Sequence, residues 1–153
     1  DLFRVLRVEF RPGTEGLVTP INADLVEDFD ALARNPRTFA DVCEVAVFLI
    51  RNTYPEISVP LTYQAFKNAL ARYASGDDAQ DWCNLVKLVY LGENGMLPDP
   101  EGLDIAQADI HAKVVRRLAR VILKGASMPD GITKQYLEDL KSWLNGLCQY
   151  HDL

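Results

Sequence analysis

The stretch TFADVCEVAVFLIRN, residues 38–52, decides the fold class that the sequence predicts. Its only charged residues are Asp41, Glu44 and Arg51, and it contains no glycine or proline. Helices that are apolar nearly all round lie at the centre of a fold or of an interface. The β-branched residues also permit a buried strand, but a run of this length without a turn signal favours a helix. We therefore expect a central helix here, with Thr38 as its N-cap.

Amphipathic segments on either side of this stretch extend the prediction to six helices with short connections. The apolar positions recur at helical spacing, and capping residues, glycine or proline bound the segments. The other five predicted helices cover residues 19–33, 62–75, 77–91, 104–124 and 132–150. Each apolar face must pack against another. The expected shared core contains Val45, Leu49, Phe66, Leu70, Leu85, Val89, Leu118 and Ile122.

The N-terminal residues are predicted as an extended arm outside this bundle. Apolar and charged residues alternate from Leu6 to Arg11, before Pro12 and Gly13 end the pattern. The arginines of this segment also fit helical spacing, which leaves a helix as the alternative. One strand alone makes no stable sheet. The predicted fold class is therefore all-α: a single compact bundle of about six helices over residues 19–153, with a short extended arm or strand over residues 1–18.

The composition of the 153 residues is that of an ordinary globular domain, with 48% hydrophobic and 25% charged residues and a net charge of −6. The three cysteines, Cys43, Cys83 and Cys148, are odd in number and widely spaced, which fits neither a disulfide framework nor a zinc site. No apolar run reaches the roughly 18 residues of a membrane span, and no signal peptide opens the chain. We expect a soluble, intracellular, cytoplasmic protein without membrane contact.

Few residues suggest catalysis or metal binding. His111 falls on the apolar side of its predicted helix, where a core or boundary position is favoured. Cys148 and His151 are three residues apart, but no second pair completes a tetrahedral site. The sequence lacks the glycine-rich phosphate loops, the nucleophile elbow and the zinc-helix motif. We expect no enzyme, no cofactor, no metal and no small-molecule substrate.

A stripe of five basic residues on the predicted helix 104–124 is the clearest candidate for a binding site. These residues, here called the basic stripe, are Lys113, Arg116, Arg117, Arg120 and Lys124. They fall within about 100° of one another on the helical wheel, and no acidic residue interrupts them. Such a stripe binds phosphates or the carboxylates of another protein. The alternative is a solvated face, with Asp109 paired to Lys113.

Two further features are candidate interfaces. The last predicted helix carries a heptad-like stripe that consists of Tyr136, Leu140, Trp143, Leu147 and Tyr150. This stripe is typical of core packing, and the alternative is docking on a neighbouring subunit. Phe48 lies on the polar strip of the central helix, so either a loop of the chain or another molecule must cover it.

These observations favour a non-enzymatic helical assembly or adaptor domain that acts through protein–protein contacts. The partner expected first is a second copy of the chain, because acidic residues dominate 77–109 and basic residues dominate 113–124. One alternative is an RNA-binding coat or nucleocapsid-type subunit, in which the basic stripe follows a single strand. The other alternative is a small enzyme with an unrecognised site.

Overall fold

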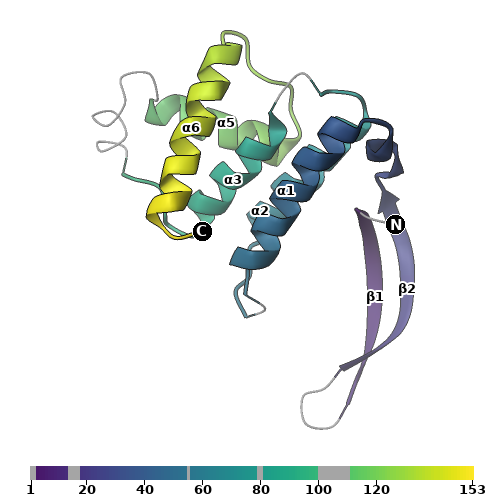
Figure 1. Cartoon of the computed structure of the whole chain (residues 1–153). Coiled ribbons are helices and arrows are strands. Elements are labelled where there is room, and N and C mark those ends of the chain that lie inside the picture. The colour runs from purple at the N-terminus through teal and green to yellow at the C-terminus, as the bar shows by residue number, and fades with distance from the viewer. Residues whose placement is uncertain (1–2, 14–17, 55, 79–80, 100–110) are drawn as a thin grey trace.

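The computed structural model describes residues 3–13, 18–54, 56–78, 81–99 and 111–153. Within them the chain forms an antiparallel hairpin, a short 3-10 helix and five α-helices (Figure 1). The hairpin consists of β1 (Arg4–Pro12) and β2 (Val18–Asp28), and the 3-10 helix is η2 (Asp30–Arg34). The α-helices are α1 (Pro36–Asn52), α2 (Pro60–Ala74), α3 (Trp82–Glu93), α5 (Ala112–Lys124) and α6 (Lys134–Tyr150).

The hairpin corrects the predicted fold class, because the described chain is a helical bundle with a two-stranded sheet and not an all-α bundle of six helices. The predicted helix over residues 19–33 is wrong: β2 occupies most of it, and η2 follows. The register runs from Arg4 opposite Asp28 to Pro12 opposite Val18. The helical spacing of the apolar residues in this segment misled the prediction, because cross-strand pairing with β1 satisfies the same residues in an extended conformation.

The helices begin at different caps from those expected. The Asn35 side chain, and not Thr38, caps α1 by accepting hydrogen bonds from the Arg37 and Thr38 amides. The α3 helix begins at Trp82, with Asp81 as its cap. The expected cap of the fifth helix, at residue 104, lies outside the described residues. Gly125 ends α5 in the left-handed region with φ of 60°, as the sequence predicts.

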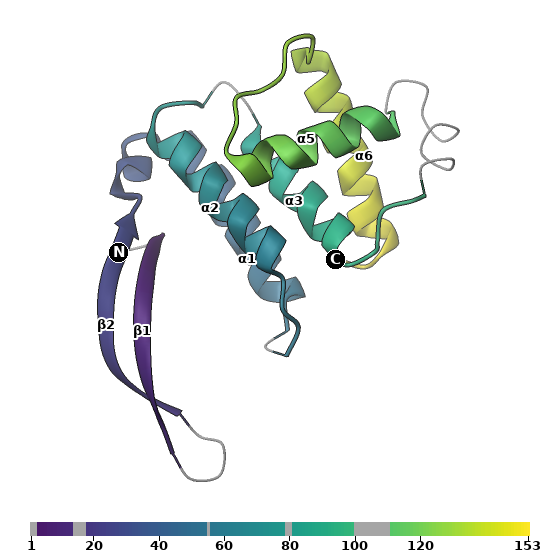
Figure 2. The same ribbon diagram turned by 180° about the vertical axis from the view of Figure 1, so that it is seen from behind.

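The α3 helix is the centre of the bundle, and every residue from Trp82 to Leu91 is buried. It packs against α1, α2, α5 and α6, and Figure 2 shows α5 crossing one side of it. Six of the eight predicted core positions are buried, and the other two, Leu49 and Phe66, are partly buried against the core. Among the described residues, no helix has both the length and the apolar character that a membrane crossing requires.

Candidate assembly interface

The exposed large hydrophobic side chains of the described residues are unevenly distributed. With the exception of Tyr150, all of them lie between Leu6 and Tyr63. They form two groups, one on the hairpin and one where α1 is connected to α2. A protein surface normally carries such side chains singly, and their accumulation on one part of a molecule marks an interaction site.

The hairpin presents an apolar face to solvent, which we call the arm face. The ladder places Leu6 opposite Leu25, Val8 opposite Ala23 and Phe10 opposite Pro20. Directly paired residues share one face of a hairpin. Leu6, Phe10 and Leu25 are each more than half exposed, at 52%, 54% and 53%.

Beyond Val5 at its base, the directly paired residues on the opposite face of the hairpin are polar. This face pairs Arg7 with Asp24, Glu9 with Asn22, and Arg11 with Thr19. The hairpin is therefore amphipathic, like a strand pair that covers a hydrophobic core. Both views show it projecting away from the helices (Figures 1 and 2), and no described residue covers the arm face.

The base of the hairpin, in contrast, is fixed to the bundle. The ring of Phe3 makes edge contacts with Phe39 and Phe66, at centroid distances of 5.8 and 6.2 Å. Two ion pairs of 2.9 Å, Arg4 with Asp30 and Lys67 with Glu27, flank this contact. The hydrogen bond to Glu27 raises the pKa of Lys67 above its usual value. The arm is thus held in a defined direction by its first residues.

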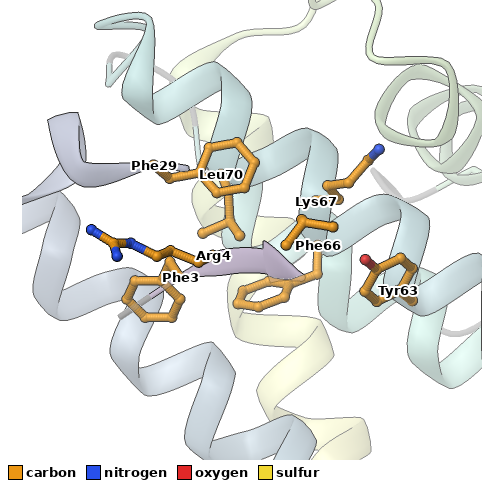
Figure 3. A pocket seen from close by; sticks show the side chains of 8 residues that line it. Phe3, Arg4, Phe29, Tyr63, Phe66, Lys67 and Leu70 are labelled. Atoms are coloured by element: carbon orange, nitrogen blue, oxygen red, sulfur yellow. The ribbon is translucent and has the colours of Figure 1, made fainter. Parts of the chain in front are cut away.

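A pocket of about 210 Å³ lies at this base (Figure 3). Its lining is largely aromatic and aliphatic, and it consists of Phe3, Arg4, Val5, Phe29, Tyr63, Phe66, Lys67 and Leu70. Its two cationic side chains are the ones engaged in the ion pairs with Asp30 and Glu27. The pocket has room for one large apolar side chain, and it adds apolar surface to the region that links arm and bundle.

The second group of exposed hydrophobic side chains is called here the α1–α2 end. It consists of Val47, Ile50, Tyr54, Ile57, Leu61 and Tyr63, with exposures from 45% for Val47 to 78% for Ile50. The backbone beneath it is well held. The Glu93 carboxylate accepts hydrogen bonds from the amides of Leu61 and Thr62 at 2.9 and 2.8 Å, and the Tyr90 hydroxyl donates one to the Asn52 carbonyl at 2.7 Å. The α1–α2 end is therefore an apolar surface whose backbone is fixed by hydrogen bonds to α3.

The interface candidates predicted from sequence lie mostly elsewhere. Phe48 is half-buried beneath α3, with its ring 5.3 Å from that of Tyr90 and 5.6 Å from the ammonium of Lys87. A helix of the same chain therefore covers it.

The stripe on α6 is divided between core and surface. Leu140 and Trp143 belong to the core, Tyr136 and Leu147 are half-buried against it, and Tyr150 is 81% exposed. The Tyr136 hydroxyl has no hydrogen-bond partner among the described residues. Most of this stripe is therefore occupied by the bundle itself.

All five side chains of the basic stripe are exposed on α5. Within the described part of the chain, which does not include Asp109, none of them forms an ion pair with an acidic residue. Neighbouring like charges three and four residues apart destabilise a helix by about 0.2–0.5 kcal/mol per pair. The other face of α5 is buried through Val115, Leu118 and Ile122. From α2, Asn68 and Arg72 hydrogen-bond to the last carbonyls of α5 and of its cap.

The candidates for reactive chemistry are dispersed. Burial raises the pKa of Cys83 to about 12 and also raises the pKa of Cys148. His111 is exposed at the N-cap of α5, so its expected position at the core boundary is wrong. His151 contacts the Met96 carbonyl at 3.0 Å. In the part of the chain that the structure describes, no three His, Cys, Asp or Glu side chains gather as a metal site would require.

Sequence reasoning missed β2 and the α1–α2 end. A signal for the hairpin was present: arginines of β1 face acidic residues of β2, as in Arg4 opposite Asp28 and Arg7 opposite Asp24. Comparisons with protein-family models, with curated proteins and with solved structures find no match for this chain.

Proposed function

We propose that this chain is a non-enzymatic assembly subunit, in which the arm face of one copy packs on the α1–α2 end of another copy. The observation that carries the proposal is the free-standing hairpin with one exposed apolar face. A two-stranded hairpin alone is marginally stable in water. Packing of its apolar face on another surface is the ordinary way to stabilise it.

The size of the arm face supports a stable contact. Half-exposed aliphatic and aromatic side chains along a nine-residue strand and its partner offer on the order of 600 Å² of apolar surface, against about 800 Å² per partner in a standard interface. The pocket at the arm base and the flanking polar groups add further contact area. A contact of this kind reaches the lower range of specific interfaces.

A second copy of the chain is the partner we propose, because each copy has both surfaces of the proposed contact, the arm face and the α1–α2 end. The arm face and the α1–α2 end are both apolar and exposed, and each lacks a cover among the described residues. The arm is directed away from the helices of its own chain (Figure 1). An arm exchanged between copies therefore buries both surfaces without rearranging either fold, as in other symmetric or head-to-tail assemblies.

The test compares an arm variant with an α1–α2 end variant by light scattering at several concentrations. We expect Phe10→Ser with Leu25→Ser, and separately Ile50→Ser with Ile57→Ser, to reduce the parent's mass to that of a monomer. Circular dichroism should show that helix content is kept. The control is Tyr150→Ser, which removes an aromatic side chain that is 81% exposed and lies outside both surfaces, and which should leave the oligomer intact.

Mixing the two variants sharpens the test. The arm variant keeps an intact α1–α2 end, and the end variant keeps an intact arm, so the mixture should form a complex of two chains. A monomeric parent at about millimolar concentration, a weak-interface limit, would contradict the proposal. So would the failure of the mixture to associate.

A further inference from the structure

The basic stripe lies outside the assembly surfaces and has no role in them. The arm face and the α1–α2 end are formed by residues before 64, whereas the stripe is on α5, which lies beside α2 and α3 in Figure 2. We propose that the basic stripe binds the phosphate backbone of single-stranded nucleic acid. This inference does not depend on the proposed self-assembly.

The charge arrangement of α5 calls for an anionic ligand. Lys113 and Arg117, Arg116 and Arg120, and Arg120 and Lys124 are each four residues apart, so like charges are neighbours along the helix. Elsewhere in the described chain, Arg4, Lys67, Arg72, Lys87 and Lys134 form ion pairs with acidic residues. The remaining cations are divided among β1, η2, α1 and α6 and are not aligned along one helix face. An anion on α5 would relieve the repulsion between the five cations.

A polyanion fits this face better than a protein does. The cores of protein interfaces are depleted in charge and rely on aromatic or aliphatic anchors. The α5 sequence, AKVVRRLARVILK, contains no aromatic residue, and its large aliphatic side chains are buried or half-buried. Phosphates, in contrast, need only charge and hydrogen-bond donors, and arginine supplies both.

The shape of the stripe favours one strand. The stripe extends over about 16 Å at 1.5 Å per residue, a single row of cations along one helix. Such a row can follow successive phosphates of one strand. The chain's net charge of −6 disfavours wide double-helical contacts, which need a broad positive surface. Without aromatic residues for stacking, we expect binding without base preference.

The experiment measures binding of a fluorescein-labelled oligouridylate of about 20 nucleotides by anisotropy, long enough for more than one site. The variant Arg116→Gln, Arg117→Gln, Arg120→Gln should bind at least tenfold more weakly than the parent. Because each phosphate contact on a single strand contributes about 0.7 to the slope of log K against log salt, the slope should flatten by about two. Glutamine keeps the helix propensity and the length of the side-chain stem.

A charge-matched control separates the stripe from general electrostatics. Arg34→Gln, Arg37→Gln and Lys141→Gln remove three exposed cations that lie outside α5, and this variant should bind within about twofold of the parent. The proposal is overturned if the parent does not bind, or if both triple variants lose affinity equally. It is also overturned if the stripe variant loses oligomer mass in the absence of RNA, because the stripe would then be a protein contact.

Discussion

The β1–β2 hairpin and the α3 helix are both rich in apolar residues, yet they differ completely in burial. Every residue of α3 from Trp82 to Leu91 is buried, including the polar Asn84 and Lys87. On the hairpin even Phe10 is 54% exposed. The difference follows from the neighbouring elements, since four helices surround α3, whereas β1 beyond its base has only β2 beside it. An apolar face favours burial. The arrangement of the elements determines whether another part of the same chain buries it, as for α3, or leaves it exposed, as for the hairpin.

Hydrogen exchange should reveal the largest difference between these two regions. Amides at the centre of α3 open only with global unfolding, whereas hairpin amides beyond the base open by local fraying. In dilute protein, where copies are separate, we expect protection factors in α3 to exceed those in β1 by at least about a thousandfold. Mass spectrometry of exchanged peptides measures both regions in one sample. Equal protection of α3 and β1 in the dilute protein would contradict the prediction, because it would show that the hairpin opens only when the whole fold unfolds.

Truncation of one aromatic residue in each region gives the next largest contrast. Trp82 is fully buried, and its indole N–H donates a hydrogen bond to the Asp77 carbonyl at 3.1 Å. Trp82→Ala should lower the free energy of unfolding by about 3–5 kcal/mol. Phe10→Ala should change it by less than about 0.5 kcal/mol in the monomer, as is usual for exposed positions. Urea denaturation at low protein concentration measures both, and a large loss for Phe10→Ala would place the arm face inside the fold.

The Asp81 cap of α3 predicts that the stability of the fold depends on pH. Burial raises the pKa of Asp81 in the folded protein above the value of about 3.9 in the unfolded chain. The folded state therefore binds this proton more tightly, and its contribution to stability falls as the pH rises from the unfolded to the folded pKa. Asn caps helices about as well as Asp and carries no charge.

We therefore expect the stability of Asp81→Asn, relative to the parent, to be higher at pH 7 than at pH 3. Thermal unfolding at the two pH values measures the change. The control is Asp81→Ala, which removes the hydrogen bond to the Asn84 amide and should lower stability by about 1 kcal/mol. If the stability of Asp81→Asn relative to the parent fell as the pH rises, the pKa of Asp81 could not be raised in the folded protein.

Thiol labelling compares α3 with α1 and requires no substitution. With a pKa of about 12, Cys83 is almost entirely protonated at pH 8, and it is buried. Cys43 on α1 is partly exposed. Because the thiolate is the reactive form, iodoacetamide should modify Cys43 at least tenfold faster than Cys83, as peptide mass spectrometry would show. The two cysteines should react at similar rates only after denaturation. Equal rates in the native protein would be inconsistent with the buried position of α3.

Most of the bundle could be predicted from sequence, because local patterns determine it. The apolar run that contains Val42 and Val45 forms a helix, and the αL glycine Gly125 ends α5 where expected. Cap identity was less predictable. Both Asn35 and Thr38 are good cap residues. The preference of proline for the first helical position favours Asn35, which precedes Pro36, but the prediction did not use this signal.

The hairpin and the candidate interface could not be predicted in the same way. Leu25, Val26, Phe29 and Leu32 have helical spacing, but the pairing of β2 with β1 is a contact between distant residues that no local pattern encodes. Two extra residues of β2 at the register shifts also disturb strict alternation. The exposure of Ile50 depends on which helices lie beside α1, and that information is absent from the periodicity of α1 itself.

The attachment of the hairpin at one end has a mechanical consequence. The arm is a lever about 30 Å long, at about 3.4 Å per residue, and its fulcrum is the cluster of Phe3 with the ion pairs of Arg4 and Lys67. A rotation of about 10° at this fulcrum would displace the far end of the arm by about 5 Å, simply in proportion to its length. Two copies linked through such an arm can therefore differ in their relative orientation while the same residues remain in contact. The curvature of an assembly would then be set at the root of the arm, where two partly exposed ion pairs respond to salt.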